Sequence, residues 1–240
     1  MARTLVIGDV HGCADELEML LDGLAVVRGT DRVVLVGDLV ARGPDAARVL
    51  RACRELDARA VRGNHEARLL RFHARGGTPG ADPGLGPRAS EHVRRAAAGL
   101  DEADFRFLAS LPLALELPEH GLVVVHAGLL PGVPLAEQQE RTLLYVRTLD
   151  DAGAPSELRD GGVPWGTRYT GPPHVAFGHN ALAEPQLHPW ATGLDTGCVY
   201  GGRLTALVLD AGEPVPPVPA RRAALASVPA RRAYAPIDPP

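Results

Sequence analysis

The stretch that decides the fold reads "RVVLVGDLVARGPDAARVLRACREL" and runs from Arg32 to Leu56. It begins with a short apolar run, passes through a loop, and ends in a segment whose apolar residues recur every three or four positions. The first pattern predicts a buried strand and the last an amphipathic helix. Asp38 and Arg42 lie on the connection between them, where a plain turn would need neither an acid nor a base.

The same plan of strand, polar loop and helix occurs on both sides of this stretch. "TLVIG" precedes a helical pattern that includes Leu17, Leu20, Leu21 and Leu24, and "ARAVRG" precedes "EARLLRFHA". Short apolar runs that alternate with amphipathic helices indicate parallel β-α-β units and an α/β fold. With 240 residues the chain can form one large α/β domain or two small ones.

The composition of the chain changes twice in its later part. A helical insertion is predicted at about 75–120, with a mobile glycine- and proline-rich loop (75–87) followed by helices at 88–100 and 101–111. Beyond it the pattern predicts a helix at 135–149 and strands at 121–128, 174–179, 193–200 and 203–210. We therefore expect one domain at 1–212. The tail 213–240 repeats "VPARRA" and is expected to be disordered or to cling to the surface without a chemical role.

Bulk composition excludes several classes of protein. The 25 basic residues, all arginine, stand against 29 acidic ones, and a net charge of −4 gives no reason to expect a nucleic-acid or membrane surface. No apolar run approaches the roughly 18 residues that span a bilayer. The three cysteines are widely spaced and form no CxxC pair, which fits a reducing cytoplasm.

Side chains that can bind metals follow five of the predicted strands. They are Asp9, His11, Asp38, Asn64, His65, His126 and His179. Ligands of α/β sheets bind at the carboxyl ends of strands, so these side chains should meet on one rim. Mixed oxygen and nitrogen donors suit manganese, iron, zinc or cobalt, and two such ions can hold both the attacking and the leaving oxygen of a phosphoryl group. Asp38 is the natural bridge between them, and a water held between the two cations would be the nucleophile.

Five motifs in order carry a family resemblance. "GDVHG", "GDLVARG", "GNHE", "VHAG" and "FGHN" resemble the signature of the calcineurin-like metallophosphoesterases, in the branch of the serine/threonine protein phosphatases and the symmetrical bis(5′-nucleosyl)-tetraphosphatases. The resemblance covers residues 4 to about 209. It implies an α/β sandwich of two central β-sheets flanked by helices.

The resemblance also implies a role for each matching residue. Asp9, His11 and Asp38 would hold one metal, and the other would be held by Asp38, Asn64, His126 and His179. His65 would donate a proton to the leaving oxygen, while Arg42, Asn64 and Arg168 would contact the substrate. Two divalent transition-metal ions are therefore the expected cofactors, with manganese preferred to iron, zinc or cobalt.

Position 41 divides the two branches. Protein phosphatases carry an aspartate there that orients the histidine of GNHE, whereas Ala41 resembles the tetraphosphatases; Glu66 resembles the protein phosphatases instead. A polyphosphate leaving group depends less on a strong general acid than a serine alkoxide does. We therefore expect symmetric hydrolysis of diadenosine tetraphosphate to two ADP, with a serine/threonine or dual-specificity protein phosphatase as the alternative.

Further alternatives stay open at this point. The substrate partner would be a dinucleoside polyphosphate or a phosphoprotein, with no membrane and no stable nucleic-acid partner. A nuclease of the same superfamily is disfavoured by the acidic balance, and an inactive scaffold by the presence of His65 and Arg42. Asp195 could orient a ligand imidazole or serve only in a turn. Arginines of the insertion could hold further phosphates or form a solvated face; they are Arg68, Arg71, Arg75, Arg88, Arg94 and Arg95.

Overall fold

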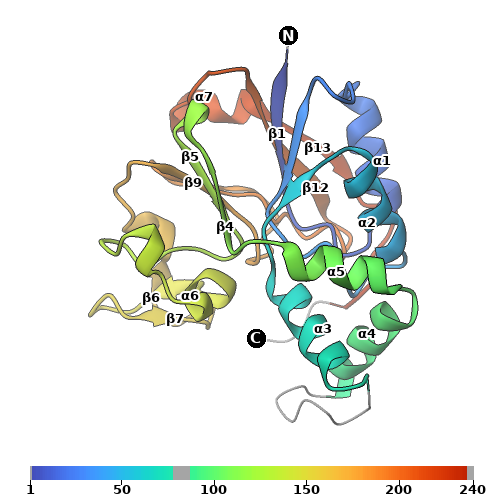
Figure 1. The fold of residues 1–240 in the computed structure, drawn as a ribbon. Helices are drawn as coiled ribbons and strands as arrows, with labels where there is room; N and C mark the ends of the chain where they lie inside the picture. The colour runs from blue at the N-terminus through green and yellow to red at the C-terminus, as the bar shows by residue number, and fades with distance from the viewer. Residues whose placement is uncertain (1, 78–86, 237–240) are drawn as a thin grey trace.

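The computed structural model describes residues 2–77 and 87–236, without the side chains of residues 87–90. Two five-stranded sheets are packed together, and a third sheet has three short strands (Figure 1). Helices flank the pair of large sheets. The expected sandwich of two central sheets flanked by helices is confirmed.

The first sheet contains the strands that the β-α-β pattern of the sequence predicted. Its order is β13 (Leu225–Pro229), β12 (Arg203–Asp210), β1 (Arg3–Ile7), β2 (Arg32–Leu35) and β3 (Arg59–Ala60). β1, β2 and β3 run parallel, as predicted. β12 pairs antiparallel with β1, and β13 antiparallel with β12.

The second sheet is built from the later half of the chain. Its order is β10 (Gln186–Leu187), β11 (Ala191–Gly193), β9 (His174–Phe177), β5 (Leu122–Val125) and β4 (Ala114–Leu117). The inner three strands, β11, β9 and β5, are parallel, so β5 and β9 end at the same edge. The small third sheet consists of β7 (Pro155–Ser156), β6 (Thr148–Leu149) and β8 (Val163–Pro164).

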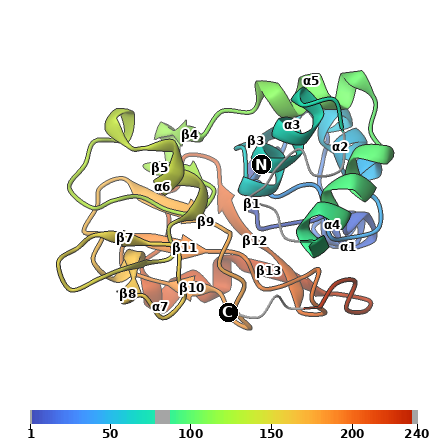
Figure 2. The same ribbon diagram turned by 90° about the horizontal axis from the view of Figure 1, so that it is seen from below.

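Most helices lie on the same side of the molecule as the first sheet (Figures 1 and 2). These are α1 (Ala14–Gly23), α2 (Ala46–Glu55), α3 (Asn64–Ala74), α4 (Pro87–Ala98) and α5 (Glu102–Ser110). On the other side of the molecule are α6 (Glu140–Tyr145) and α7 (Val218–Arg221). Four 3₁₀ turns complete the described elements: η1 (Pro118–His120), η2 (Leu135–Glu137), η3 (Trp165–Thr167) and η4 (Arg222–Ala224).

Alternation along the strands separates the layers of the core. On β1, Val6 packs between the two sheets while Ile7 packs under the helices. On β5, Val124 faces the first sheet, whereas Val125 faces a third cluster that contains the buried Trp165. Because both faces of these strands are buried, they read as continuous apolar runs, and their ends are rigidly fixed.

Several predicted elements differ from the structure. The helix predicted at 135–149 is divided into η2, α6 and β6, since Val146 takes an extended conformation after α6. The strand predicted at 193–200 is a loop after β11, stabilised by turns such as Tyr200 N–H to Gly197 O. The two insertion helices are confirmed as α4 and α5, whereas most of the predicted mobile loop at 75–87 falls outside the described residues.

The tail was expected to be disordered or to cling to the surface, and the structure differs from this expectation. Five of its residues form β13, which pairs with β12 along its whole length. Arg221 is 1 % exposed, and its guanidinium donates to the backbone oxygens of His188, Pro189, Ala191 and Pro216. Apolar periodicity could not reveal this segment because it is held largely by backbone pairing and by one buried arginine.

Within the described residues, no helix combines the length and apolarity that a bilayer crossing requires.

Candidate metal centre

The predicted ligands meet where strands of both large sheets end. Asp9 and Asp38 follow β1 and β2, and Asn64 begins α3 just after β3. His126 and His179 follow β5 and β9 of the second sheet. All five side chains are buried, with at most 8 % of their surface exposed. The rim predicted from the parallel strands is therefore present, and it joins the two sheets.

The backbone at this rim is strained. His11, Asp38, Arg42 and His179 all have φ between +49° and +67°, the left-handed region that non-glycine residues seldom adopt. Each such residue costs on the order of 1–3 kcal/mol and persists only where its surroundings hold it. Four of the seven non-glycine residues with positive φ in the described part of the chain are thus predicted functional residues, and a fifth, Ala41, is adjacent to Arg42.

Glu66 holds the loop that carries Asp38. Its carboxylate is fully buried, and Oε2 accepts from the backbone N–H groups of Asp38 (2.8 Å) and Gly63 (2.7 Å). Oε1 accepts from Leu39 (2.9 Å) and Val40 (3.1 Å). A glycine is needed at position 63, because a Cβ there would come within 2.3 Å of Asp38 Oδ1. Glu66 thus connects "GNHE" to "GDLV" and fixes the direction of Asp38.

One ligand cluster consists of Asp38, Asn64, His126 and His179. Asn64 Oδ1 lies 2.9 Å from His126 Nε2 and 3.2 Å from His179 Nδ1, and Asp38 Oδ2 is 3.5 Å from His126 Nε2. His126 Nδ1 lies 3.0 Å from the carbonyl oxygen of Val36, which can only accept. Nδ1 therefore carries the proton, and the lone pair of Nε2 is directed toward Asn64 and Asp38.

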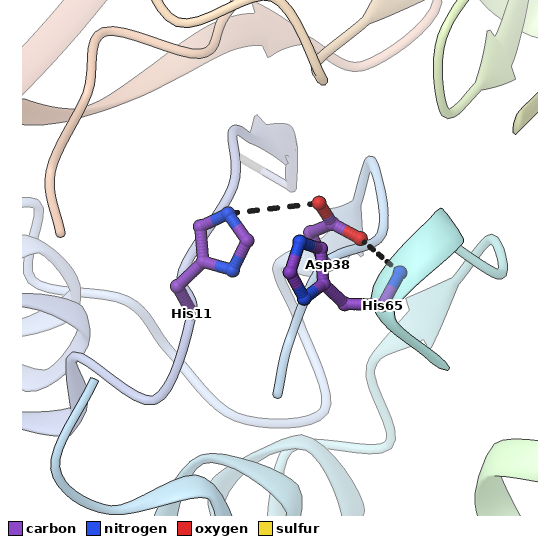
Figure 3. Close-up of side chains that lie close together, drawn as sticks. All are labelled: His11, Asp38 and His65. Carbon is purple, nitrogen blue, oxygen red and sulfur yellow. Dashed lines mark hydrogen bonds and ion pairs between the residues drawn. The ribbon is translucent and has the colours of Figure 1, made fainter. Parts of the chain in front are cut away.

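A second cluster consists of His11, Asp38 and His65 (Figure 3). His11 Nε2 lies 3.6 Å from Asp38 Oδ2, and its Nδ1 donates to Val40 O at 3.3 Å. Asp38 Oδ1 accepts from the backbone N–H of His65 at 2.9 Å. Asp38 therefore belongs to both clusters, which is the position that a bridging carboxylate requires.

Asp9 lies beside these clusters. Its carboxylate accepts from the backbone N–H of His179, at 3.0 Å to Oδ2 and 3.2 Å to Oδ1. Gly178 makes this contact feasible, since a Cβ at that position would come within 1.8 Å of Asp9 Oδ1. Asp9 is thus packed against the loop that carries His179.

Buried carboxylates crowd the rim. Burial raises the pKa of Asp38 to about 6, against the lowering effect of the His65 N–H and of Arg42. Burial likewise raises the pKa of Asp195 to about 6, and burial together with Asp195 and Asp38 raises that of Asp9 well above its ordinary value. Positive charge placed beside these carboxylates would lower their pKa values again.

The imidazoles show the complementary shift. Burial, followed by the charge of Arg42, lowers the pKa of His11 to about 3, and burial lowers that of His126 to about 4. Burial is also the main cause that lowers the pKa of His65 and His179 well below the ordinary value. At neutral pH these rings are neutral and can offer lone pairs.

The residues fit a centre of divalent metal ions. Neutral imidazole lone pairs, an amide oxygen and a shared carboxylate converge at 2.9–3.6 Å. Two acceptors such as His126 Nε2 and Asn64 Oδ1 repel each other at this separation unless a cation lies between them or the amide is turned around. The donor set of oxygen and nitrogen suits first-row divalent ions.

A cleft of about 270 Å³ covers the clusters. Arg42 and Arg68 line it from the side of the first sheet, and Arg147 and Arg159 from the loops of the small third sheet. The expectation for Arg168 is not supported, because this residue is exposed at the end of η3 and is absent from the described residues that line the cleft.

The insertion arginines differ in which expected role they fit, the binding of further phosphates or the formation of a solvated helix face. Arg68 lines the cleft, with its guanidinium 5.8 Å from the ring centre of Tyr145. Arg95 lines a neighbouring cavity together with Arg42, while Arg94 pairs with Glu91 on an exposed face. Arg68 is thus placed to meet a substrate phosphate, whereas Arg94 belongs to a solvated helix face.

His65 has an unusual environment. Its Nε2 accepts from Arg42 Nε at 3.2 Å, so Nδ1 carries the proton. This Nδ1 is buried and has no hydrogen-bond partner among the described residues. Ala41, at φ +68°, offers no carboxylate to it. Ala41 therefore leaves His65 without the carboxylate that an aspartate at this position would offer.

Sequence reasoning gave no role to several residues of the site. Tyr200 meets Arg42 through its hydroxyl, and Arg147 belongs to a segment that was predicted to be helical. Glu66 was noticed only as a branch marker. Asp195 shows the turn role, since Oδ1 accepts from Gly197 N–H, and its side chain also lines the cleft. For Glu66 the available signal was an acid at the third position of a helix, where a carboxylate can accept from backbone N–H groups at the helix start.

The sequence matches known proteins over most of its length. Residues 2–205 match the family of calcineurin-like phosphoesterases. An asymmetrical bis(5′-nucleosyl)-tetraphosphatase PrpE from Oceanobacillus iheyensis is 31% identical over 220 residues, covering 84% of this chain and 86% of the relative. A symmetrical bis(5′-nucleosyl)-tetraphosphatase from Erwinia tasmaniensis is 30% identical over 263 residues, covering 85% and 93%.

Solved structures agree in fold. A crystal structure assigned provisionally as a diadenosine tetraphosphatase is 35% identical with a TM-score of 0.79, covering 95% of this chain and 93% of its own. A serine/threonine protein phosphatase from Saccharomyces cerevisiae, at 17% identity and a TM-score of 0.57, covers 100% and 81% and shares the fold.

Proposed function

Because the chain belongs to the calcineurin-like phosphoesterase family, and is thus a metal-dependent hydrolase of phosphoric esters or anhydrides, we propose that it hydrolyses dinucleoside tetraphosphates. The proposed reaction is symmetric and converts diadenosine tetraphosphate into two ADP. Relatives named as tetraphosphatases of both kinds support the substrate class. We keep a reducing cytoplasm as the proposed location, with all three cysteines free.

Two divalent ions, with manganese proposed ahead of iron, zinc or cobalt, would be held by Asp9 and by residues of the two clusters other than His65. The proposed ligands are Asp9, His11, Asp38, Asn64, His126 and His179. When bound, such ions supply Lewis acidity and make water nucleophilic at neutral pH. The chain contributes the rigid positions of these side chains, and Glu66 and Gly63 fix the direction of Asp38.

The arginines of the cleft support a polyphosphate substrate. Arg42 and Arg68 come from one wall, and Arg147 and Arg159 from the other. Guanidinium groups on two sides can bind phosphates on both sides of a central anhydride bond. A phosphoserine side chain has a single phosphate and would leave one of these walls unused. This distribution of charge favours cleavage at the centre of the chain of four phosphates.

The observation that carries the choice of substrate is the environment of His65. His65 Nε2 accepts from Arg42, and its Nδ1 has no partner among the described residues, none of which offers it a carboxylate to stabilise an imidazolium. A serine alkoxide would need strong protonation as it leaves. A nucleoside diphosphate is a far weaker base, so positive charge around it is sufficient. The proposed anhydride chemistry thus demands less of His65 than a phosphoester would.

The test compares diadenosine tetraphosphate with a phosphoserine peptide, in manganese and in chelator, with chromatographic analysis of the products. We expect manganese-dependent formation of ADP alone. ATP together with AMP would identify asymmetric cleavage, the second candidate, which the PrpE relatives favour. A tenfold or greater preference in kcat/KM for the phosphopeptide would overturn the proposal.

Ala41→Asp provides a second arm of this experiment. An aspartate tolerates the left-handed backbone at position 41 and would restore a carboxylate near His65. We expect activity on the phosphopeptide to rise more than activity on the dinucleotide. Equal changes on both substrates would contradict the role assigned to His65.

A further inference from the structure

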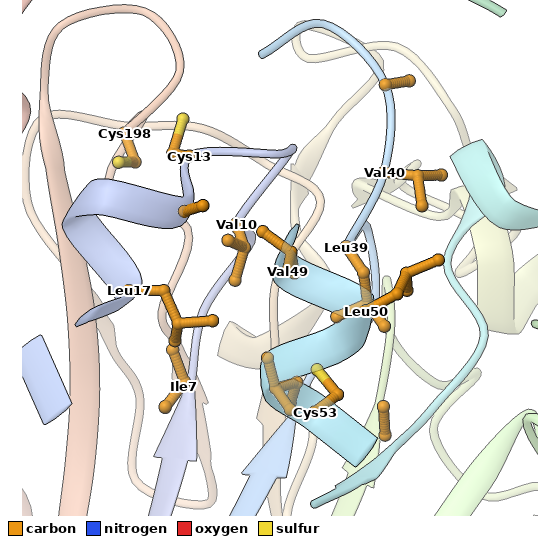
Figure 4. Packing of buried hydrophobic residues seen from close by; sticks show 14 of the residues in the cluster. Ile7, Val10, Cys13, Leu17, Leu39, Val40, Val49, Leu50, Cys53 and Cys198 are labelled. Carbon is orange, nitrogen blue, oxygen red and sulfur yellow. The ribbon is translucent and has the colours of Figure 1, made fainter. Parts of the chain in front are cut away.

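A separate group of ligand-type side chains lies at the start of α1. One ligand atom each from Cys13, Glu16 and Cys198 lie within 4.8 Å of one another, and all three residues are buried. Cys13 immediately precedes α1, Glu16 is in its first turn, and Cys198 belongs to the loop between β11 and β12. Figure 4 shows the two cysteines together, with Cys53 farther away on α2.

One carboxylate oxygen of Glu16 lacks a hydrogen-bond partner among residues 2–77 and 87–236. Its Oε1 accepts from the backbone N–H of Arg231 (2.9 Å) and from the hydroxyl of Tyr234 (2.7 Å). Its Oε2 is buried and has no hydrogen-bond partner in the described part of the chain. An unpaired buried carboxylate oxygen carries a large desolvation cost, which a cation beside it would remove. Glu16 is 0 % exposed, so bulk solvent does not reach this oxygen.

The two thiols add soft ligands beside this oxygen. The Cys13 thiol lies at the long distance of 4.0 Å from His11 O. Its hydrogen bond with the Cys198 thiol, followed by burial, raises the pKa of Cys198. Cys13 occupies the N-cap position of a ten-residue helix, and its side chain does not cap the helix. Two thiolates and one carboxylate form a typical donor set for zinc and for similar soft divalent ions.

We propose that Cys13, Glu16 and Cys198 form a third metal site, which binds a zinc-type soft divalent cation. An ion with bond lengths of about 2.0–2.3 Å holds its ligands roughly 3.3–3.8 Å apart, so closing from within 4.8 Å needs side-chain movements of about 1 Å. Each thiol gives up its proton on binding, so up to two protons leave per ion. The nitrogen and oxygen donors of the proposed hydrolase centre make that centre chemically distinct.

The site would tie three parts of the fold together. Glu16 is bonded to the tail through Arg231 and Tyr234, and the tail in turn donates from the N–H groups of Tyr234 and Ala235 to Val199 O. An ion shared by α1 and the loop of Cys198 would therefore also hold the tail segment around Tyr234. Protection of this tail segment on metal binding can therefore be measured independently of hydrolase activity.

Cobalt titration tests the proposal in the reduced, metal-depleted full-length protein. A sulfur-to-cobalt charge-transfer band in the near ultraviolet can come only from a cysteine ligand. We expect it in the wild type and in Cys53→Ser, the matched control with a buried cysteine at 1 % exposure. The double variant Cys13→Ser, Cys198→Ser should lack the band while keeping the visible cobalt bands of the hydrolase centre.

Glu16→Gln keeps the thiols and an acceptor for Tyr234, and it should weaken this cobalt affinity at least tenfold. Zinc loading should also slow proteolysis within residues 231–236 in the wild type and leave it unchanged in the double variant. A wild type without the charge-transfer band at saturating cobalt would overturn the proposal. So would a band that persists in the double variant, an unchanged affinity in Glu16→Gln, or a disulfide between Cys13 and Cys198 in the protein as isolated.

Discussion

Replacing Asp38 with asparagine should make the metal-free protein more stable while it removes metal binding. Burial raises the pKa of Asp38 from 3.8 to about 6, so the folded protein holds this proton more tightly than the unfolded chain. Between about pH 4 and pH 6 the unfolded state therefore binds fewer protons, and stability falls as pH rises. Above pH 6 the penalty is constant, at up to about 3 kcal/mol from 1.36 kcal/mol per pKa unit.

The asparagine fits the local hydrogen bonds. Its Oδ1 can still accept from His65 N–H, and its amide can donate to the Nε2 lone pairs of His11 and His126, which lie 3.6 and 3.5 Å from the present Oδ2. The variant should thus gain about 1–3 kcal/mol at pH 7.5 in chelator and little at pH 4.5. With saturating manganese the wild type should become the more stable of the two proteins, because only the wild type gains binding energy from the metal.

Denaturant unfolding across this pH range, with and without manganese, measures both effects. Asp31→Asn is the control of opposite sign, because hydrogen bonds from Arg3 lower the pKa of Asp31 to about 2 and its charge stabilises the fold above pH 4. That variant should lose up to about 2 kcal/mol at pH 7.5. A metal-free Asp38→Asn protein that is less stable than the wild type at pH 7.5, or that keeps two ions at unchanged affinity, would refute the reasoning.

Three other substitutions or truncations follow from the same structure. Arg42→Ala should lower kcat/KM by about 10²–10³ with metal content unchanged, and a loss below tenfold would remove Arg42 from the phosphate. Glu66→Gln leaves two of four backbone N–H groups without an acceptor and should weaken metal binding about 10–100-fold by calorimetry; an unchanged Kd would show that Asp38 is held by other means. A chain ending at Gly212 loses β13 and Arg221. Its free energy of unfolding should fall by about 3 kcal/mol, which lowers the melting temperature by about 6–12 °C. An unchanged melting temperature would show that the tail does not stabilise the fold.

The strand exits could be predicted because one pattern encodes both burial and chemistry. An apolar run before Asp38 or His126 indicates a buried strand, and its end must then face the rim. Long-range contacts had no such signal. The bonds from Glu66 to the loop of Asp38 join residues 26–28 positions apart, and their partners are backbone groups of any residue type.

The arginines of the cleft show the same limit. Arg147 and Arg159 reach the cleft only because residues after α6 form a small sheet of two-residue strands, which are too short to produce a periodic pattern. Arg168 was inferred from motif resemblance in a region of variable spacing, and the fold placed it elsewhere. A matching residue type was not enough to assign a role to Arg168, because its position relative to the motif is not fixed.

The place of β12 in the first sheet determines when the protein can be completed during synthesis. β12 lies between β1, at the beginning of the chain, and β13, near its end, with Arg3 opposite Asp210 and Leu207 opposite Leu225. A ribosome must therefore release about 200 residues before the free edge of β1 finds its partner, and pairings this distant in sequence form slowly. During that interval β1 exposes an unpaired apolar edge to other nascent chains. Until β12 is available, this edge can pair with a strand of another chain instead of its own partner.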